Sequence, residues 1–365
     1  MDIIGLIKKI NLMPNSKEKA MQICLISSYI NFLVESMQIS KEKASKIIEQ
    51  INDVDVFLKH FVADEKKEIY SLLDSASILN PIYKDILNYS NNYPLFSGNI
   101  PNINIEKLIN YAKDFLFYID SDLLQLFNKL LDKDLIVESD INDFGGKCHK
   151  LNGDLSGIII KYNAVDFYKV MTIIHEMGHA YYHYLNKSIP NLTRSNIANE
   201  CIPRTLEQLF LVYLKDNYLI DENTINKYER FFLIHQLRLT NSVYIINNLL
   251  IKNIINSDFY PENIKAILSY PDYYELSIIK PKDNEFMKYL SFSYNYYSYA
   301  FILSQIIREN FVENPNETIK FIKEIPFLAI DMNAKEFIDL YDKNDYLSAT
   351  KKNISRILSK KYYKK

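Results

Sequence analysis

The stretch His175-Glu176-Met177-Gly178-His179 decides how this chain is interpreted. It has the form HExxH, and residues four apart on an α-helix lie one above the other on the same face. His175 and His179 can therefore direct two imidazoles at one metal ion, with the Glu176 carboxylate beside them to handle protons. The residues on either side are mostly apolar, which predicts a buried helix.

A buried His-Glu-His cluster without a metal would leave polar groups unpaired, at a considerable cost in free energy. The alternative is a chance occurrence of the pattern on a structural helix. The chain has only 6 His in 365 residues, so chance matches are rare. We therefore predict a metal site, with one Zn²⁺ per chain.

A catalytic zinc site needs three protein ligands and one open position. The third histidine of an HExxHxxGxxH pattern is absent, because Tyr182 and Leu185 occupy its glycine and histidine positions. A glutamate on the next helix is the other solution, and Glu200 follows His175 by 25 residues. Glu207 lies two helical turns beyond Glu200 on the same face, and we expect it to orient a ligand histidine or anchor the cleft.

Two further residues bear on the geometry of the site. His183 follows His179 by one turn, but a straight helix cannot wrap three successive histidines around one ion. We interpret His183 as a supporting or structural residue. Pro203 removes the hydrogen bond to the carbonyl of Asn199, which predicts Glu200 at a helix start or a kink.

This ligand set predicts hydrolysis. Zinc lowers the pKa of bound water from about 16 to about 7, which makes hydroxide available at neutral pH, and it polarises a scissile carbonyl. Glu176 would accept the water proton and pass it to the leaving amine. A donor to the oxyanion is also required.

The distribution of glycine predicts a mainly α fold. Four of the 7 glycines lie between residues 145 and 157, and none follows Gly178. Residues 1–140 are predicted to form an N-terminal helical lobe, and residues 141–365 a catalytic region with a small sheet and a C-terminal helical lobe. Ser40 resembles a helix cap, and turns are expected near five prolines of the C-terminal region, which are Pro261, Pro271, Pro281, Pro315 and Pro326.

The β-branched run after Gly157 predicts a strand beside the metal helix. An exposed edge at Gly157, Ile158 and Ile159 would pair with an extended peptide and hold it across the metal. A plain structural hairpin is the alternative.

Composition predicts a soluble globular protein, with 48% apolar residues, 24% charged residues and a formal net charge of −2. A net charge this close to zero gives no general electrostatic attraction to nucleic acid or to an anionic membrane. The N-terminus lacks the pattern of a secretory signal, and no stretch approaches the roughly 18 apolar residues of a spanning helix. The 3 Cys form no CxxC motif, which favours a reducing cytoplasm.

The segment Tyr294-Asn295-Tyr296-Tyr297-Ser298-Tyr299-Ala300-Phe301 completes a set of three motifs. Together with HEMGHA at 175–180 and with Glu200 followed by Glu207, it resembles the thimet oligopeptidase and oligoendopeptidase F family of zinc metallopeptidases. The glycine-bearing residues 144–163 are also similar to the hairpin that precedes that family's metal helix.

The resemblance implies zinc on His175, His179 and Glu200, with Glu176 as general base. By position, Tyr299 matches the tyrosine that donates to the oxyanion, and Tyr296 and Tyr297 are neighbouring candidates for contact with substrate. It also implies a two-lobed helical zincin-type fold around a central channel that admits short peptides. Only 174 residues precede the motif, so the lobe that covers the channel is expected to be reduced.

The predicted function is a cytoplasmic zinc endopeptidase that acts on oligopeptides, either as a monomer or as a homodimer. A thermolysin-like glutamate zincin is an alternative, although Pro203 and Arg204 occupy the Ser-Asp positions of its NExxSD pattern. The other alternative is a peptide-binding or regulatory protein that keeps the site without turnover. The intact Glu176 disfavours it, because a non-catalytic site needs no base.

Overall fold

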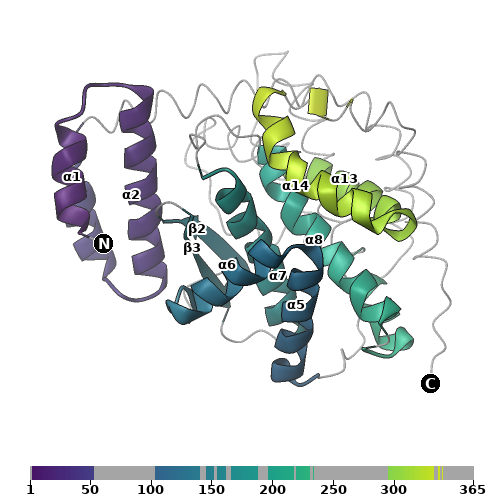
Figure 1. Ribbon diagram of the computed structural model, residues 1–365. Helices are drawn as coiled ribbons and strands as arrows, with labels where there is room; N and C mark the ends of the chain where they lie inside the picture. The colour runs from purple at the N-terminus through teal and green to yellow at the C-terminus, as the bar shows by residue number, and fades with distance from the viewer. Residues whose placement is uncertain are drawn as a thin grey trace, which may run out of the picture.

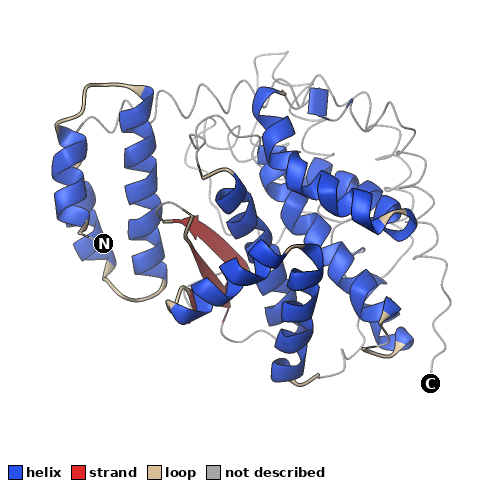
Figure 2. Ribbon diagram, in the orientation of Figure 1, coloured by secondary structure: helices blue, strands red, loops and turns tan. Residues whose placement is uncertain are grey.

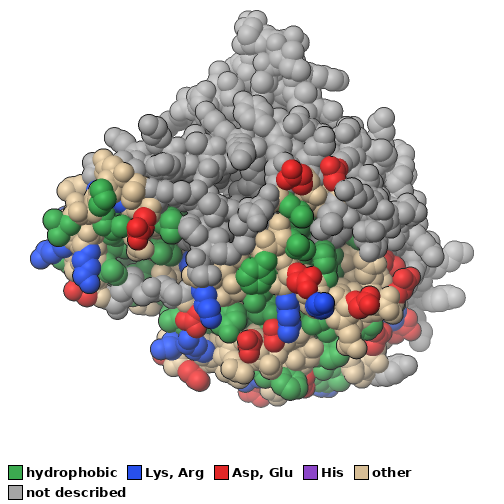
Figure 3. All heavy atoms as spheres, turned by 45° about the horizontal axis from the view of Figure 1, so that its top comes forward, with side chains coloured by type: hydrophobic (Ala, Val, Ile, Leu, Met, Phe, Trp, Pro, Cys, Tyr) green, Lys and Arg blue, Asp and Glu red, His purple; other side chains and the backbone are tan. Residues whose placement is uncertain are grey.

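The computed structural model describes residues 2–52, 103–139, 145–151, 154–161, 166–187, 196–217, 219–230, 233, 295–332, 336–337 and 339. Within these residues the chain is mostly helical and has one small sheet, which confirms the predicted mainly α class (Figures 1 and 2). None of the helices in this part of the chain combines the length and the apolar character needed to cross a bilayer. On the face drawn in Figure 3, basic and acidic side chains of the described residues are interspersed.

The N-terminal helices pack around a small apolar core of their own. They are α1 (Ile3–Asn11), α2 (Lys17–Glu35) and α3 (Lys41–Ile48), and each begins at a side chain that caps a backbone N–H. The predicted cap at Ser40 is confirmed, because its hydroxyl accepts a hydrogen bond from Lys43 N–H at 3.2 Å. In Figure 1 this group lies at one side of the molecule, with α2 nearest the sheet.

Helices α5 (Ile105–Ile119) and α6 (Ser121–Asp132) bury their apolar faces in the large core that also contains the HExxH helix. Asp120 joins the two helices and accepts a hydrogen bond from the buried hydroxyl of Tyr181. The large core thus draws on residues from both sides of position 140, the boundary predicted from the sequence. Residues 2–52 form a core of their own and also contribute Phe32 and Leu33 to a third cluster with Leu151 and Ile159.

The sheet consists of β1 (Ile136–Ser139), β2 (Gly146–Lys150) and β3 (Ser156–Lys161), in the order β1-β3-β2. Strand β3 is central, parallel to β1 and antiparallel to β2, so its backbone is paired on both sides. The prediction that Gly157, Ile158 and Ile159 offer a free edge to a peptide is therefore wrong. An almost continuous run of β-branched residues is typical of a strand that is covered on both faces, as β3 is.

Gly157 has a packing role instead. A Cβ atom at this position would lie 2.5 Å from the ring of Phe32, so the missing side chain lets α2 approach the sheet closely.

The HExxH motif lies in α7 (Asp166–Leu185), which packs along α8 (Asn196–Asp216). The two backbones approach closely where Gly178 faces Pro203, since a Cβ atom on Gly178 would lie 2.5 Å from the Cα of Pro203. Helix α8 begins at Asn196 and continues through Pro203, so Glu200 lies in its second turn, whereas Pro203 was expected to place Glu200 at a helix start or a kink.

Helix α13 (Asn295–Glu313) packs extensively along α8 and is followed by α14 (Pro315–Asp331). The predicted turn at Pro315 is confirmed, because this proline occupies the first position of α14. The turn expected at Pro326 is wrong: α14 continues through it, with buried Ile322 and Ile325 anchoring the helix in the core. The other predicted proline turns, at Pro261, Pro271 and Pro281, lie outside the described residues.

Candidate metal centre

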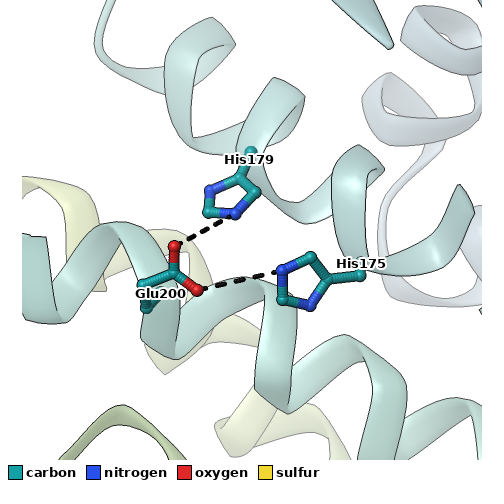
Figure 4. Close-up of side chains that lie close together, drawn as sticks. All are labelled: His175, His179 and Glu200. Carbon is teal, nitrogen blue, oxygen red and sulfur yellow. Dashed lines mark ion pairs between the residues drawn. The ribbon is translucent and has the colours of Figure 1, made fainter. Parts of the chain in front are cut away.

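Three potential metal ligands converge between α7 and α8. One imidazole nitrogen from His175, one from His179 and one carboxylate oxygen from Glu200 all lie within 4.8 Å of one another. Figure 4 shows the two histidines projecting from the same helix towards the glutamate on the other helix. The i, i+4 spacing of the histidines produces this arrangement, because it brings both rings to the face of α7 that packs on α8.

The Nε2 atoms of both histidines point at the same carboxylate. His175 Nε2 lies 3.8 Å from Glu200 Oε2, and His179 Nε2 lies 3.3 Å from Glu200 Oε1. The two rings are nearly perpendicular, with centroids 5.0 Å apart. The three side chains are largely buried, with exposed fractions of 11%, 11% and 6%.

The remaining ring nitrogens contact oxygen acceptors. His175 Nδ1 lies 3.2 Å from Glu207 Oε1 in an ion-pair contact, and His179 Nδ1 lies 3.2 Å from the amide Oδ1 of Asn199. With Nδ1 of each ring facing an oxygen atom, Nε2 of each ring faces Glu200. This is the ring orientation that a metal ligand at Nε2 requires.

The buried charges shift one another's pKa values. Burial raises the pKa of Glu176 to about 7, against an opposing effect of His175. Burial alone would raise the pKa of Glu207, but the charges of Arg204 and His175 outweigh it and hold that pKa at about 2. Burial acts to lower the pKa of His175, but the charge of Glu207 outweighs it, so this pKa is raised. Burial lowers the pKa of His179.

The donor set fits a zinc ion. Among the described residues, the buried Oε2 of Glu200 has no hydrogen-bond partner, so one acceptor is left for another ligand. Two ligand atoms at zinc-bonding distances in a tetrahedral site lie about 3.4 Å apart. The separations of the two Nε2 atoms from Glu200, 3.3 Å to Oε1 and 3.8 Å to Oε2, are close to this value.

A cavity of about 260 Å³ opens beside these ligands. One wall is formed by α7 and α8, and the other by strand β2. The lining residues are Gly146, Lys147, Cys148, His149, His175, Glu176, His179, His183, Asn199 and Glu200. Glu176 lies against the strand, because a Cβ atom on Gly146 would be only 2.7 Å from its Oε1.

The edge strand at this cavity is β2, not β3. Lys161 N–H donates to the Gly145 carbonyl at 3.1 Å. Given the register of β2 and β3, Lys147 and His149 then also form hydrogen-bonded pairs with β3. Residues alternate in an antiparallel ladder, so Gly146 and Cys148 direct their backbone N–H and C=O groups away from β3. No described strand pairs with that outer edge of β2.

The remaining predicted site residues fall into two groups. His183 lines the cavity but lies outside the ligand group, since its Nδ1 contacts Ser156 Oγ at 3.0 Å and Cys148 Sγ at 4.0 Å. The backbone of Tyr296, Tyr297 and Tyr299 belongs to the first turns of α13, which packs on α8. The side chains of these tyrosines lie outside the described residues.

Sequence reasoning assigned no role in the site to Asn199, Arg204 or the outer edge of β2. Asn199 precedes a candidate ligand directly, and Arg204 lies three residues before Glu207, which is contact distance on a helix. These spacings were the available signals. The order of the strands has no comparable signal in the sequence.

The fold is shared with a known structure. A crystal structure of a candidate oligoendopeptidase F from Bacillus anthracis str. Ames matches with a TM-score of 0.53 at 16% identity, over 98% of this chain and 69% of that chain. This likeness establishes the fold, which is that of a candidate peptidase. A candidate peptidase from Chlamydophila abortus gives a TM-score of 0.47 at 11% identity, over 94% of this chain and 63% of that chain. No family model and no curated protein matches the chain.

Proposed function

We propose that the chain is a zinc-dependent peptidase that hydrolyses oligopeptides. The observation that carries the proposal is the convergence of His175, His179 and Glu200 at a cavity that Glu176 also lines. A fold shared with a candidate oligoendopeptidase F supports the same reaction class. The three motifs of the sequence support it independently.

In this proposal, His175, His179 and Glu200 hold the metal, while Glu207 and Asn199 fix the rings of the two histidines. Zinc bound there supplies the Lewis acidity that lowers the pKa of water to about 7 and polarises the scissile carbonyl. Glu176 accepts the proton of the attacking water and delivers it to the departing amine.

The outer edge of β2 is the proposed binding site for the peptide backbone. Gly146 and Cys148 direct their N–H and C=O groups along the cavity, so an extended peptide can add as a further antiparallel strand. Backbone pairing of this kind binds peptides of varied sequence, which suits an oligopeptidase. We place an extended peptide in the cavity lined by β2, α7 and α8, with an internal bond at the metal ligands, and this makes the proposed enzyme an endopeptidase.

The tyrosines of α13 complete the proposed site. Tyr299 is proposed to donate to the oxyanion of the tetrahedral intermediate, and Tyr296 and Tyr297 to contact the substrate. The close packing of α13 along α8, which carries Glu200, supports this placement.

The test combines metal analysis with digestion of a quenched peptide library by the wild type and by Glu176→Gln. We expect one zinc per chain in both proteins. Cleavage by the variant should be about 10²–10⁴-fold slower, because the general base is lost and the ligands are kept. Zinc binding without cleavage by the wild type would instead favour a peptide-binding protein. Equal cleavage by the two proteins would contradict the role of Glu176.

A further inference from the structure

A chain of buried polar contacts leads from Arg204 to the candidate ligand His175. The Nη1 atom of Arg204 lies 3.0 Å from Glu207 Oε2 and 3.4 Å from Oε1. Glu207 Oε1 in turn lies 3.2 Å from His175 Nδ1. Arg204 does not line the cavity; it reaches the site by its contact with Glu207 and by its charge, which acts to lower the pKa values of His175, Glu176 and His179.

The guanidinium of Arg204 compensates negative charge that is buried around the histidines. Three buried carboxylates, those of Glu176, Glu200 and Glu207, lie at the site. A divalent cation would compensate the negative charge nearest the ligand position, and the guanidinium of Arg204 compensates that of Glu207, which it contacts. Burying an uncompensated carboxylate is costly, and an arginine remains protonated in such surroundings.

The position of Arg204 is set by the backbone. It follows Pro203, whose Cα packs directly on Gly178 of the metal helix. Arg204 and Glu207 are three residues apart on α8, so their side chains meet on one face. The arginine is therefore held in register with the carboxylate that contacts His175.

We propose that Arg204 is a positioning residue for the metal centre: by fixing the Glu207 carboxylate, it holds the ring of His175 in the orientation that directs Nε2 at the ligand position. The proposal rests on the proposed zinc site, and it adds a residue that the metal itself never contacts. Arg204 acts on metal affinity and on the orientation of one histidine ring.

The first measurement is zinc affinity, by competition with a chelating indicator. Glu207→Gln, which removes the partner of a metal-ligating histidine, is expected to weaken binding about 10- to 100-fold, and Arg204→Gln is expected to reproduce part of that loss. Arg204→Lys, which keeps the charge, should recover part of the loss. Arg204→Gln added to Glu207→Gln should cause little further loss, because the two residues act in series.

A matched control is available in Arg308. This arginine also forms a buried ion pair, with Nη2 2.5 Å from Glu229 Oε1, and it does not line the cavity. Arg308→Gln is expected to lower the melting temperature and to leave the zinc affinity of the folded protein unchanged. A loss of affinity equal to that of Arg204→Gln would show a general effect of destabilisation and would overturn the proposal.

The second measurement needs no metal. A crystal structure of the metal-free protein should show the His175 ring with Nδ1 at Glu207 in the wild type and a turned ring in Arg204→Gln. If the wild type binds no zinc but this difference is seen, the proposed function fails and the role of Arg204 in holding the ring stands. If zinc binds and Arg204→Gln changes neither affinity nor ring orientation, the role of Arg204 is overturned and the proposed function stands.

Discussion

The cavity has two unlike walls. The α7–α8 wall presents imidazoles and carboxylates, which buried ion pairs hold in place. The β2 wall presents backbone groups, and α2 holds it from behind: the Glu35 carboxylate lies 2.8 Å from Lys147 Nζ and 2.9 Å from His149 Nε2. In the proposed function, reactive groups and peptide-holding groups therefore come from separate elements with separate supports. Changes to the first wall should alter kcat, and changes to the second should alter KM.

The largest effect is expected at Gly146, where the two walls of the cavity touch. Gly146→Ala would place a Cβ atom 2.4 Å from Thr172 Cγ2 and 2.7 Å from Glu176 Oε1, so the carboxylate must move. Because displacement of a catalytic group by about 1 Å can cost on the order of 100-fold, we expect kcat to fall by about that factor.

Gly145→Ala is the matched control for this change. A Cβ atom there would meet its nearest atom, Thr172 Oγ1, at an ordinary 3.7 Å. Steady-state kinetics on one quenched peptide should therefore separate the two variants clearly. An equal loss of kcat in both would mean that the contact with Glu176 is not the cause.

A smaller effect is expected from releasing the support of the β2 wall. Glu35→Gln removes the carboxylate that contacts both Lys147 and His149, while the α7–α8 wall is untouched. We expect KM to rise several-fold with kcat nearly unchanged, and the free energy of unfolding to fall by about 1 kcal/mol. A drop in kcat with constant KM would contradict the division of roles.

The same carboxylate gives a pH dependence of stability. Burial acts to raise the pKa of Glu35, but the hydrogen bonds and charges of His149 and Lys147 outweigh it, so the pKa in the folded state is lowered. The unfolded state then binds more protons, and this stabilisation is present above about pH 4.5 and is lost as the pH falls through the lowered pKa. Denaturant unfolding between pH 3 and pH 7 should show a shallower acid limb in Glu35→Gln than in the wild type.

The two walls also differ in how far the sequence predicts them. The i, i+4 spacing of His175 and His179 translates directly into geometry, because a helix fixes the direction of its side chains locally. Glu200 follows His175 by 25 residues, which is enough chain for a turn and a second helix packed on the first. The predicted third donor, Glu200, does lie with the two histidines in one group.

The β2 wall, in contrast, could be predicted only in part. The β-branched residues 158–160 predicted a strand correctly, but strand order is decided by pairing between distant segments, and the local pattern could not show that β3 is central. Gly157 suggested an open edge, whereas its true neighbour is Phe32, more than a hundred residues earlier. Contacts at such separations leave no periodic signal in the chain.

The central claim is that His175, His179 and Glu200 bind one metal ion together, and zinc stoichiometry tests it most directly. Zinc should be measured by mass spectrometry after equilibration at matched free metal, in the wild type and in Glu200→Gln, which keeps the size of the side chain. The account predicts one zinc per chain in the wild type and a clear loss in the variant. A wild type without zinc, or a variant that retains the full amount, would contradict it.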